Sequence, residues 1–434
     1  MEEILSLAKK STQQAEVFLT SYEETPVIFE TNRLKQLHTH QSLVVALRII
    51  REGRVGFSTT TSLDDRSSLV SRAIEVSQFG APARFELPAA KVYPRVETYD
   101  PEIEAFTTEQ MIDLGESLLA KVRGHTAELI CEAGITKGIV SVRLLNSRGG
   151  EASYRKSFFG ISLEGNLIRD TDMLFVGDSE SSCHLISDPG KVADSVINQL
   201  ELAKRQASIS NEHLPVIFTP LGVASALIAP LALAFNGRIV LQGASPLGEK
   251  RGERVFDERL SLWDDATISH RPGSRPCDDE GVPSQSTPLI VGGVVGDFLY
   301  DLQTAGLAGV QSTGNGERGE GDLPCPSISS LVFGSGDTSF EEMVGGMEKG
   351  LVVEQLMGAE QTNVLGGEFS GNVLLGYKVE RGEIVGRVKD TVVSGNVYKV
   401  LERLIEIGHE ARWVRGTIFT PAFCCSNLKI ASKG

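Results

Sequence analysis

An order of elements that occurs twice in the first half of the chain limits the possible folds more than any other feature. Residues 1–19 have apolar side chains at helical spacing, short β patterns follow them, and a second helix is predicted with Ser62 as its N-cap. The same order returns as a helix over 107–123 with a Thr cap, several β segments, and a closing helix over 187–208. A repeated order of helix, antiparallel strands and helix predicts a duplicated α+β unit.

The character of the chain changes after about residue 213. An apolar segment over 221–235 is predicted to form a buried helix or helix pair, since Pro230 interrupts it. Most of the chain beyond this segment has β patterns and turns, such as GYKVERGEIVGRV with its turn at ERGE. Helical spacing returns only near 339–350 and 394–407. This part is therefore predicted to be rich in β structure.

These patterns predict an α+β fold class with four parts. They are an N-terminal α+β unit (1–85), a linker (86–106), a central α+β unit that repeats the first (107–212), and a β-rich C-terminal domain (213–434). A chain of 434 residues is too long for one ordinary core, which agrees with more than one domain.

Charge and cysteine content narrow the class of partner and the compartment. Lys and Arg total 42 against 57 Asp and Glu, a net charge of −15, so we expect no binding to nucleic acid. The longest apolar run, 221–235, is too short to span a bilayer, so we expect no membrane segment. Six cysteines without a metal-binding spacing predict reduced thiols and a cytoplasmic protein.

Two local patterns resemble binding sites, one for a dinucleotide and one for a metal ion. GNGERG at 314–319 fits G-x-G-x-x-G, but Pro324 and Pro326 prevent the helix that would hold a pyrophosphate, so we interpret it as a loop. Its backbone N–H groups and Arg318 are suited to a carboxylate or a peptide backbone. His38 and His40 share a strand face, yet no third metal ligand lies nearby in the sequence.

The stretch CDDEGVPSQ, residues 277–285, places three carboxylates together at Asp278, Asp279 and Glu280. Oxygen ligands of this kind suit a hard cation. However, Gly281 follows at once and a proline comes two residues later, and Asp favours the entry of turns. Residue types alone therefore favour a turn over a metal site.

Several longer pieces, read together, resemble one known family. They are VFDERLSLWDDA (255–266), CDDEGVPSQSTPLIVGGVVGDFLYDLQTAGLAG (277–309), STGNGERG (312–319), SFEEMVGGMEKGLVVEQLMG (339–358), GEFSG (367–371) and GYKVERGEI (376–384). With GRVGFSTTTSLDD near the front, their order and spacing resemble the TldD/PmbA family, and most closely its PmbA branch, also called TldE.

The resemblance implies a role in proteolysis. Members form a cytoplasmic two-chain metalloprotease, TldD with a PmbA-type partner, that acts on unfolded or modified peptides. An older family label is modulator of DNA gyrase. The resemblance also implies that residues Asp278, Asp279, Glu280, Asn315 and Arg318 border a peptide channel.

The TldD branch carries His-Glu-x-x-x-His at the start of its last domain, which supplies zinc ligands and a general base. In this sequence, the matching positions are Ala229, Pro230 and Ala234, none of which can serve as a metal ligand or a base. Residues 221–235 contain no His, Asp, Glu or Cys at all. We therefore expect no catalytic residue, metal or cofactor in this chain, and zinc in its TldD-type partner.

Three hypotheses are compatible with these observations. The first is a non-catalytic PmbA-type subunit that binds a TldD-type chain and helps guide an extended peptide along strand edges. The second is a self-sufficient homodimer that binds peptides without hydrolysis. The third is a metallopeptidase with an unrecognised site, for example one built on His38 and His40.

Overall fold

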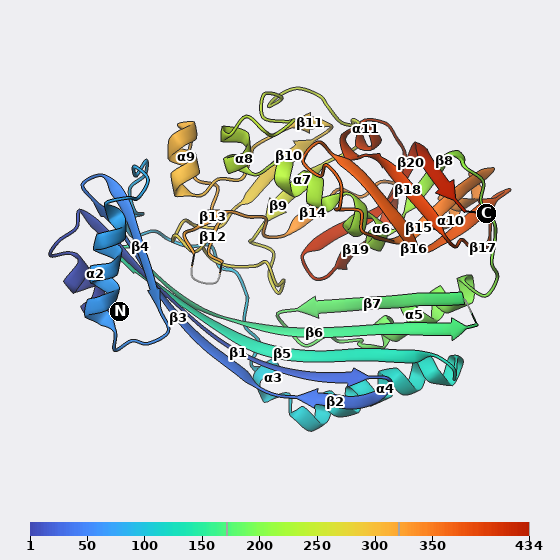
Figure 1. The fold of residues 1–434 in the computed structure, drawn as a ribbon, viewed down its shortest axis with the longest axis horizontal. Coiled ribbons are helices and arrows are strands. Elements are labelled where there is room, and N and C mark those ends of the chain that lie inside the picture. The colour runs from blue at the N-terminus through green and yellow to red at the C-terminus, as the bar shows by residue number, and fades with distance from the viewer. Residues whose placement is uncertain (171, 320–321, 434) are drawn as a thin grey trace.

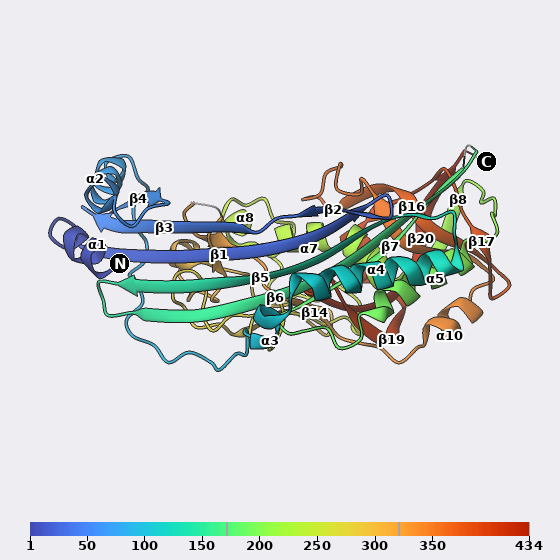
Figure 2. The ribbon, with the colours of Figure 1, turned by 90° about the horizontal axis from the view of Figure 1, so that it is seen from below.

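The computed structural model describes residues 1–170, 172–319 and 322–433. A long antiparallel sheet from the first half of the chain lies beneath a β-rich C-terminal part (Figure 1). Its strands run along the length of the molecule, with α1 and α2 at one end and α4 and α5 at the other (Figure 2). The predicted α+β class and its β-rich C-terminal part are confirmed.

Both predicted units contribute to a single seven-stranded sheet. Its order is β4-β3-β1-β5-β6-β7, and β2 pairs with β1. The units meet where β1 pairs with β5, and each continues outward through its next two long strands. Strands β3 and β4 therefore extend the sheet from β1 as β6 and β7 extend it from β5, while β2 is an additional strand beside β1. The bounds are β1 Gln14–Glu30, β2 Arg33–Leu37, β3 His40–Arg51, β4 Arg54–Thr60, β5 Ile130–Asn146, β6 Glu151–Arg169 and β7 Asp172–Ser182.

Apart from α3, which lies in the predicted linker, the helices of the first half follow the predicted order. Thr107 caps α4 in a capping box with Gln110, as its sequence position predicts. Helix α2 starts three residues later than expected, with Asp65 rather than Ser62 at the N-cap position. The bounds are α1 Glu2–Ala8, α2 Arg66–Ser77, α3 Pro101–Ala105, α4 Thr108–His125 and α5 Gly190–Leu202.

The helix predicted over 1–19 is wrong beyond Ala8. Residues from Gln14 onward form β1, where Ala15 and Val17 are both fully buried. Glu16 and Phe18 are buried as well, because both faces of this end of β1 are covered, and β1 is paired on both sides by β3 and β5. The apolar residues of this segment also fit a helix, so the pairing with neighbouring strands determines its secondary structure.

The C-terminal part is built on an eleven-stranded sheet of order β11-β10-β9-β14-β20-β18-β16-β15-β8, with β17 beside β16 and β19 beside β20. The predicted hairpin at ERGE is confirmed by the β16–β17 pair. The strand bounds are β8 Glu212–Phe218, β9 Leu262–Asp265, β10 Ser286–Val291, β11 Val294–Val295, β14 Leu331–Phe333, β15 Lys349–Met357, β16 Glu368–Glu380, β17 Glu383–Arg387, β18 Thr391–Asn396, β19 Leu404–Val414 and β20 Ile418–Ser432. A separate two-stranded sheet pairs β12 (Gly316–Glu317) with β13 (Cys325–Pro326).

Helices in this part are short. The apolar segment 221–235 forms a helix pair, in agreement with one of the two predicted forms. The helix predicted over 394–407 is only α11, because strands β18 and β19 take its two ends, and the one predicted over 339–350 ends at Gly345. The bounds are α6 Pro220–Ala226, α7 Ile228–Ala234, α8 Gly237–Leu241, α9 Leu302–Ala308, α10 Phe340–Gly345 and α11 Val397–Glu402. No helix in the described part of the chain is long and apolar enough to cross a membrane.

One hydrophobic core is shared by the second unit and the C-terminal part. It includes Val196 and Leu200 of α5 together with Ile217 of β8, Val352 of β15 and Tyr377 of β16, all at most 4% exposed. We call these five residues the apolar joint. The main core of the first unit is made instead by residues of its own helices and strands, such as those of α1 and β3. The two units are therefore attached to the C-terminal part in different ways.

Candidate functional site

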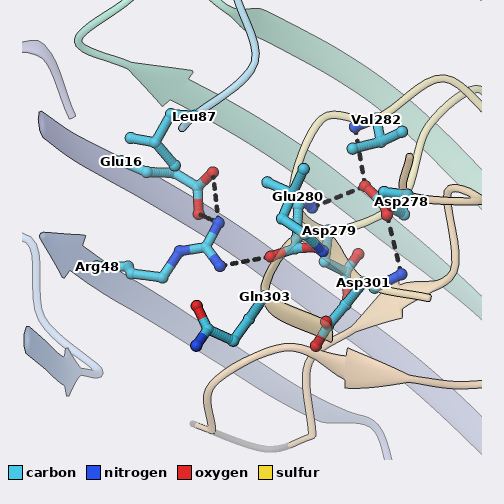
Figure 3. Close-up of polar contacts among 12 residues, drawn as sticks. Glu16, Arg48, Leu87, Asp278, Asp279, Glu280, Val282, Asp301 and Gln303 are labelled. Carbon is cyan, nitrogen blue, oxygen red and sulfur yellow. Dashed lines mark hydrogen bonds and ion pairs between the residues drawn. The ribbon is translucent and has the colours of Figure 1, made fainter. Parts of the chain in front are cut away.

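The acidic stretch at 278–281 is a buried turn (Figure 3). The N–H of Gly281 donates to the carbonyl of Asp278, and Gly281 has a φ of +75°, which glycine adopts without strain. One carboxylate oxygen of Asp278 accepts from the backbone N–H of Glu280 at 3.0 Å and of Val282 at 2.9 Å. The first Asp thus holds the turn closed, the usual role of Asp at such positions.

The same turn fastens the loop that contains GNGERG. The second carboxylate oxygen of Asp278 accepts from the N–H of Gly316 at 2.9 Å, and that of Asp279 accepts from the N–H of Arg318 at 2.8 Å. A Cβ at position 316 would lie 2.5 Å from a carboxylate oxygen of Glu280, so glycine is required there. The loop that was predicted for GNGERG is therefore confirmed. Gly316 is needed in it because Glu280 packs closely against this position.

Four buried charged side chains connect this turn to the first unit. Arg48 of β3 lies between two carboxylates, with nitrogen–oxygen distances of 3.0 Å to Glu16 of β1 and 2.5 Å to Glu280 (Figure 3). Arg318 reaches Glu16 from the other side at 2.5 Å. All four side chains are at most 4% exposed. We call Glu16, Arg48, Glu280 and Arg318 the ionic joint.

Burial dominates the electrostatics of the turn. It raises the pKa of Glu280, while the guanidinium of Arg48 opposes that rise. Burial also raises the pKa of Asp278, which Arg275 and three backbone N–H donors oppose. Glu280 additionally accepts from the N–H of Leu302 at 2.6 Å, at the first residue of α9. Each carboxylate therefore has donors to compensate its burial, as the stability of buried charges requires.

A cleft of about 1220 Å³ opens beside the ionic joint, between the long sheet and the C-terminal part. Its floor is one face of the sheet, to which β1, β3, β5 and β6 contribute alternate residues. Its other walls come from the turn after Pro272, the GNGERG loop and the end of β4. Residues of the floor include Thr20, Tyr22, Val44, Val142, Tyr154 and Lys156.

The structure separates the five predicted channel residues into two groups. Asp279 and Arg318 line the cleft. Asp278 and Glu280 are buried in the turn, where they bind backbone N–H groups and Arg48. Asn315 is 2% exposed, and its amide donates to Asp264 at 2.6 Å. The last three residues shape the wall rather than face the cleft.

Helix α7 places the three positions matched to the zinc site in an apolar surrounding. Pro230 and Ala234 are buried, and Ala234 lies in the main core of the C-terminal part with Leu231 and Phe235. Pro230 lies in the first turn of α7, where a missing backbone N–H is tolerated. Within residues 1–170, 172–319 and 322–433, no group of three or more His, Cys, Asp or Glu residues is arranged to hold a metal ion.

The prediction that His38 and His40 share a strand face is wrong, because His38 lies in the connection after β2 and His40 is the first residue of β3. Their exposed rings nevertheless touch edge to face, with centroids 4.4 Å apart. Cys424 and Cys425 are buried, and all six cysteines are free.

Sequence reasoning missed Glu16, Arg48 and Lys156. Arg48 carried a usable indication, because it is the one charged residue inside the apolar run SLVVALRII. A charge in the middle of such a strand is almost never buried without a partner. Its partner Glu280 is 232 residues away in the chain, so only the fold identifies it.

Family comparisons agree with this architecture. The sequence model of the PmbA/TldA metallopeptidase C-terminal domain matches residues 211–432, and that of PmbA/TldA metallopeptidase domain 1 matches residues 15–77. The fold and the two matched domains therefore place this chain in a class of proteins related to metallopeptidases. The chain belongs to the TldD/PmbA family.

Relatives cover nearly the whole chain at low identity. The crystal structure of TldE from Thermococcus kodakarensis has a TM-score of 0.90 and 23% identity, with full coverage of both chains. An uncharacterised protein of Methanocaldococcus jannaschii is 23% identical over 97% of both chains. A metalloprotease TldD homologue of Buchnera aphidicola is 24% identical over 94% of this chain and 88% of its own.

Proposed function

We propose that this chain is the PmbA-type, non-catalytic subunit of a TldD–PmbA metalloprotease in the cytoplasm. It would bind a TldD-type chain that carries zinc, and supply a surface for unfolded peptide substrates. Six free cysteines support a reducing compartment for the complex.

The observation that carries this proposal is the composition and packing of α7. The positions that the family resemblance assigns to zinc ligands and general base hold hydrocarbon side chains, two of them buried in or against the core. A zinc site needs imidazole, thiolate or carboxylate donors in these positions. The β-rich domain is retained, while its segment 221–235 offers no such donor.

The cleft supports the peptide-binding part of the proposal. Its volume, about 1220 Å³, exceeds the usual range for a single small molecule and suits several residues of an extended peptide. The backbone of the floor is already paired, because β3, β1, β5 and β6 are consecutive neighbours in the sheet. A peptide on this floor would therefore be held by side chains, and not by the strand-edge pairing that the sequence suggested.

The test is hydrolysis of an unfolded peptide by three preparations. These are this chain alone, a TldD-type chain from the same genome alone, and the two mixed. The proposal predicts hydrolysis by the mixture that exceeds the sum of the separate chains, and none by this chain alone. Hydrolysis by this chain alone would support a metallopeptidase with an unrecognised site, and a mixture no more active than the TldD-type chain would refute the subunit role.

A further inference from the structure

Lys156 stands apart among the charged residues of the cleft. It lies on β6 between Tyr154 and Phe158, and all three side chains line the floor because they alternate along the strand. Among the cationic residues described in the cleft lining, Lys156 is the one without an ion-pair partner. The others are each matched, Arg72 by Asp65, Arg275 by Asp279 and Arg318 by Glu16.

The surroundings of Lys156 leave its positive charge uncompensated at close range. Burial lowers the pKa of Lys156, and the positive charge of Arg275 acts in the same direction. Cys183 gives the largest contribution in the opposite direction, followed by Glu317 and Asp279 on the C-terminal side of the cleft, but none of the three forms an ion pair with the lysine. A partly buried ammonium group normally has an anionic or hydrogen-bonding partner.

A second cation beside it also has unused donors. Arg275 is 7% exposed, and its contact with Asp279 is long, 3.9 Å from Nη1 to Oδ1. Its Nε and Nη2 groups have no hydrogen-bond partner. These two groups form one edge of the guanidinium, the fork that fits both oxygens of a carboxylate. Both atoms are shielded from solvent, so an anion reaches this edge only after a neighbouring side chain moves.

We propose that the cleft contains a carboxylate-binding subsite, in which Lys156 binds the anion and Arg275 provides the second positive charge. The ligand class is a peptide carboxylate, either a chain terminus or an Asp or Glu side chain. The choice of a peptide rests on the proposed function, whereas the choice of a carboxylate rests on the unpaired donors of the cleft. The subsite would therefore select acidic or carboxyl-terminal segments among unfolded peptides.

The test measures direct binding to the isolated full chain by fluorescence anisotropy. The probe is a hexapeptide of Ala and Val that carries an uncharged BODIPY dye on its N-terminus, in three forms. One has a C-terminal amide, one a free C-terminal carboxylate, and one an amide with a central Glu. We expect at least one carboxylate form to bind about 10- to 100-fold more tightly than the neutral amide, as for other hydrogen bonds to charged groups. The form that does so identifies the source of the carboxylate.

Three variants locate the effect. Lys156→Met removes the charge and keeps an extended side chain, and should abolish the preference for carboxylate. Lys156→Arg should retain it, which also controls for folding at this position. Lys35→Met removes the same charge from the exposed strand β2, outside the cleft lining, and should leave the preference unchanged.

Equal binding of all three peptides to the parent chain would overturn the proposal, and so would an unchanged preference in Lys156→Met. Because no partner chain is present, this result is independent of the hydrolysis test. If the chain prefers carboxylate peptides but the mixture shows no partner-dependent hydrolysis, only the subunit role is refuted. If partner-dependent hydrolysis occurs but the chain shows no preference for carboxylate peptides, only the subsite is refuted.

Discussion

The C-terminal part is joined to the long sheet in two chemically different ways. At the second unit, the apolar joint merges both parts into one hydrophobic core around Val352 and Tyr377. At the first unit, the ionic joint connects β1 and β3 to the turn at 278–281 through Arg48, beside a small apolar cluster that includes Cys277. The cleft lies beside the ionic joint, and its floor extends across β5 and β6 of the second unit.

The contrast between the two joints indicates what fixes the geometry of the cleft. Apolar contacts are non-directional and tolerate small changes of position. Buried ion pairs require good geometry, and they leave a costly charge behind when one partner is lost. We infer that the apolar joint holds the two parts together, while the ionic joint sets the position of the first unit relative to the cleft wall.

The largest effect is expected from breaking the ionic joint. Arg48→Met should lower the free energy of unfolding by about 3–5 kcal/mol, because Glu280 keeps its buried position without its cation. Urea denaturation gives the overall effect, and hydrogen exchange should show the loss of protection concentrated in β1 and β3.

The control is Arg51→Met on the same strand, because the Arg51 side chain is 36% exposed and pairs with exposed Glu52. It should change stability by less than about 0.5 kcal/mol. Equal changes in the free energy of unfolding for the two substitutions would show that the ionic joint does not stabilise the fold.

An intermediate effect is expected from pH on the cleft, because Lys156 has no ion-pair partner among the described residues there, whereas each of the four residues of the ionic joint has one. Burial lowers the pKa of Lys156 below the 10.5 of an ordinary lysine, so Lys156 loses its charge at a lower pH than an ordinary lysine as the pH rises. Carboxylate affinity should fall by about tenfold, or 1.4 kcal/mol, in alkaline solution. A titration of peptide binding in which Lys156→Arg shows the same decline would contradict this assignment.

The smallest effect is expected from trimming the apolar joint. Ile217→Val removes one methylene from a fully buried side chain and should cost about 0.5–1.5 kcal/mol. Peptide binding in the cleft should be unchanged, since neighbouring side chains can partly close the gap. If this variant instead altered peptide affinity more than Arg48→Met, the division of roles between the two joints would be wrong.

The sequence predicted local features well and long-range ones poorly. The cap at Thr107 and the turn at ERGE depend on adjacent residues, and both occur as predicted. The strand from Gln14 was predicted as helix because its pairing with β5 involves residues more than 100 positions away. The same limit applies to the cleft, whose walls come from segments as distant as β1 and the GNGERG loop.

The proposed division of labour gives the binding surface to this chain and the zinc to its partner. Elemental analysis can check it on the isolated chain, purified without a metal-chelating tag, beside its complex with a TldD-type chain. We predict no stoichiometric zinc in the isolated chain and one zinc per pair in the complex. One tightly held zinc per isolated chain would contradict this division.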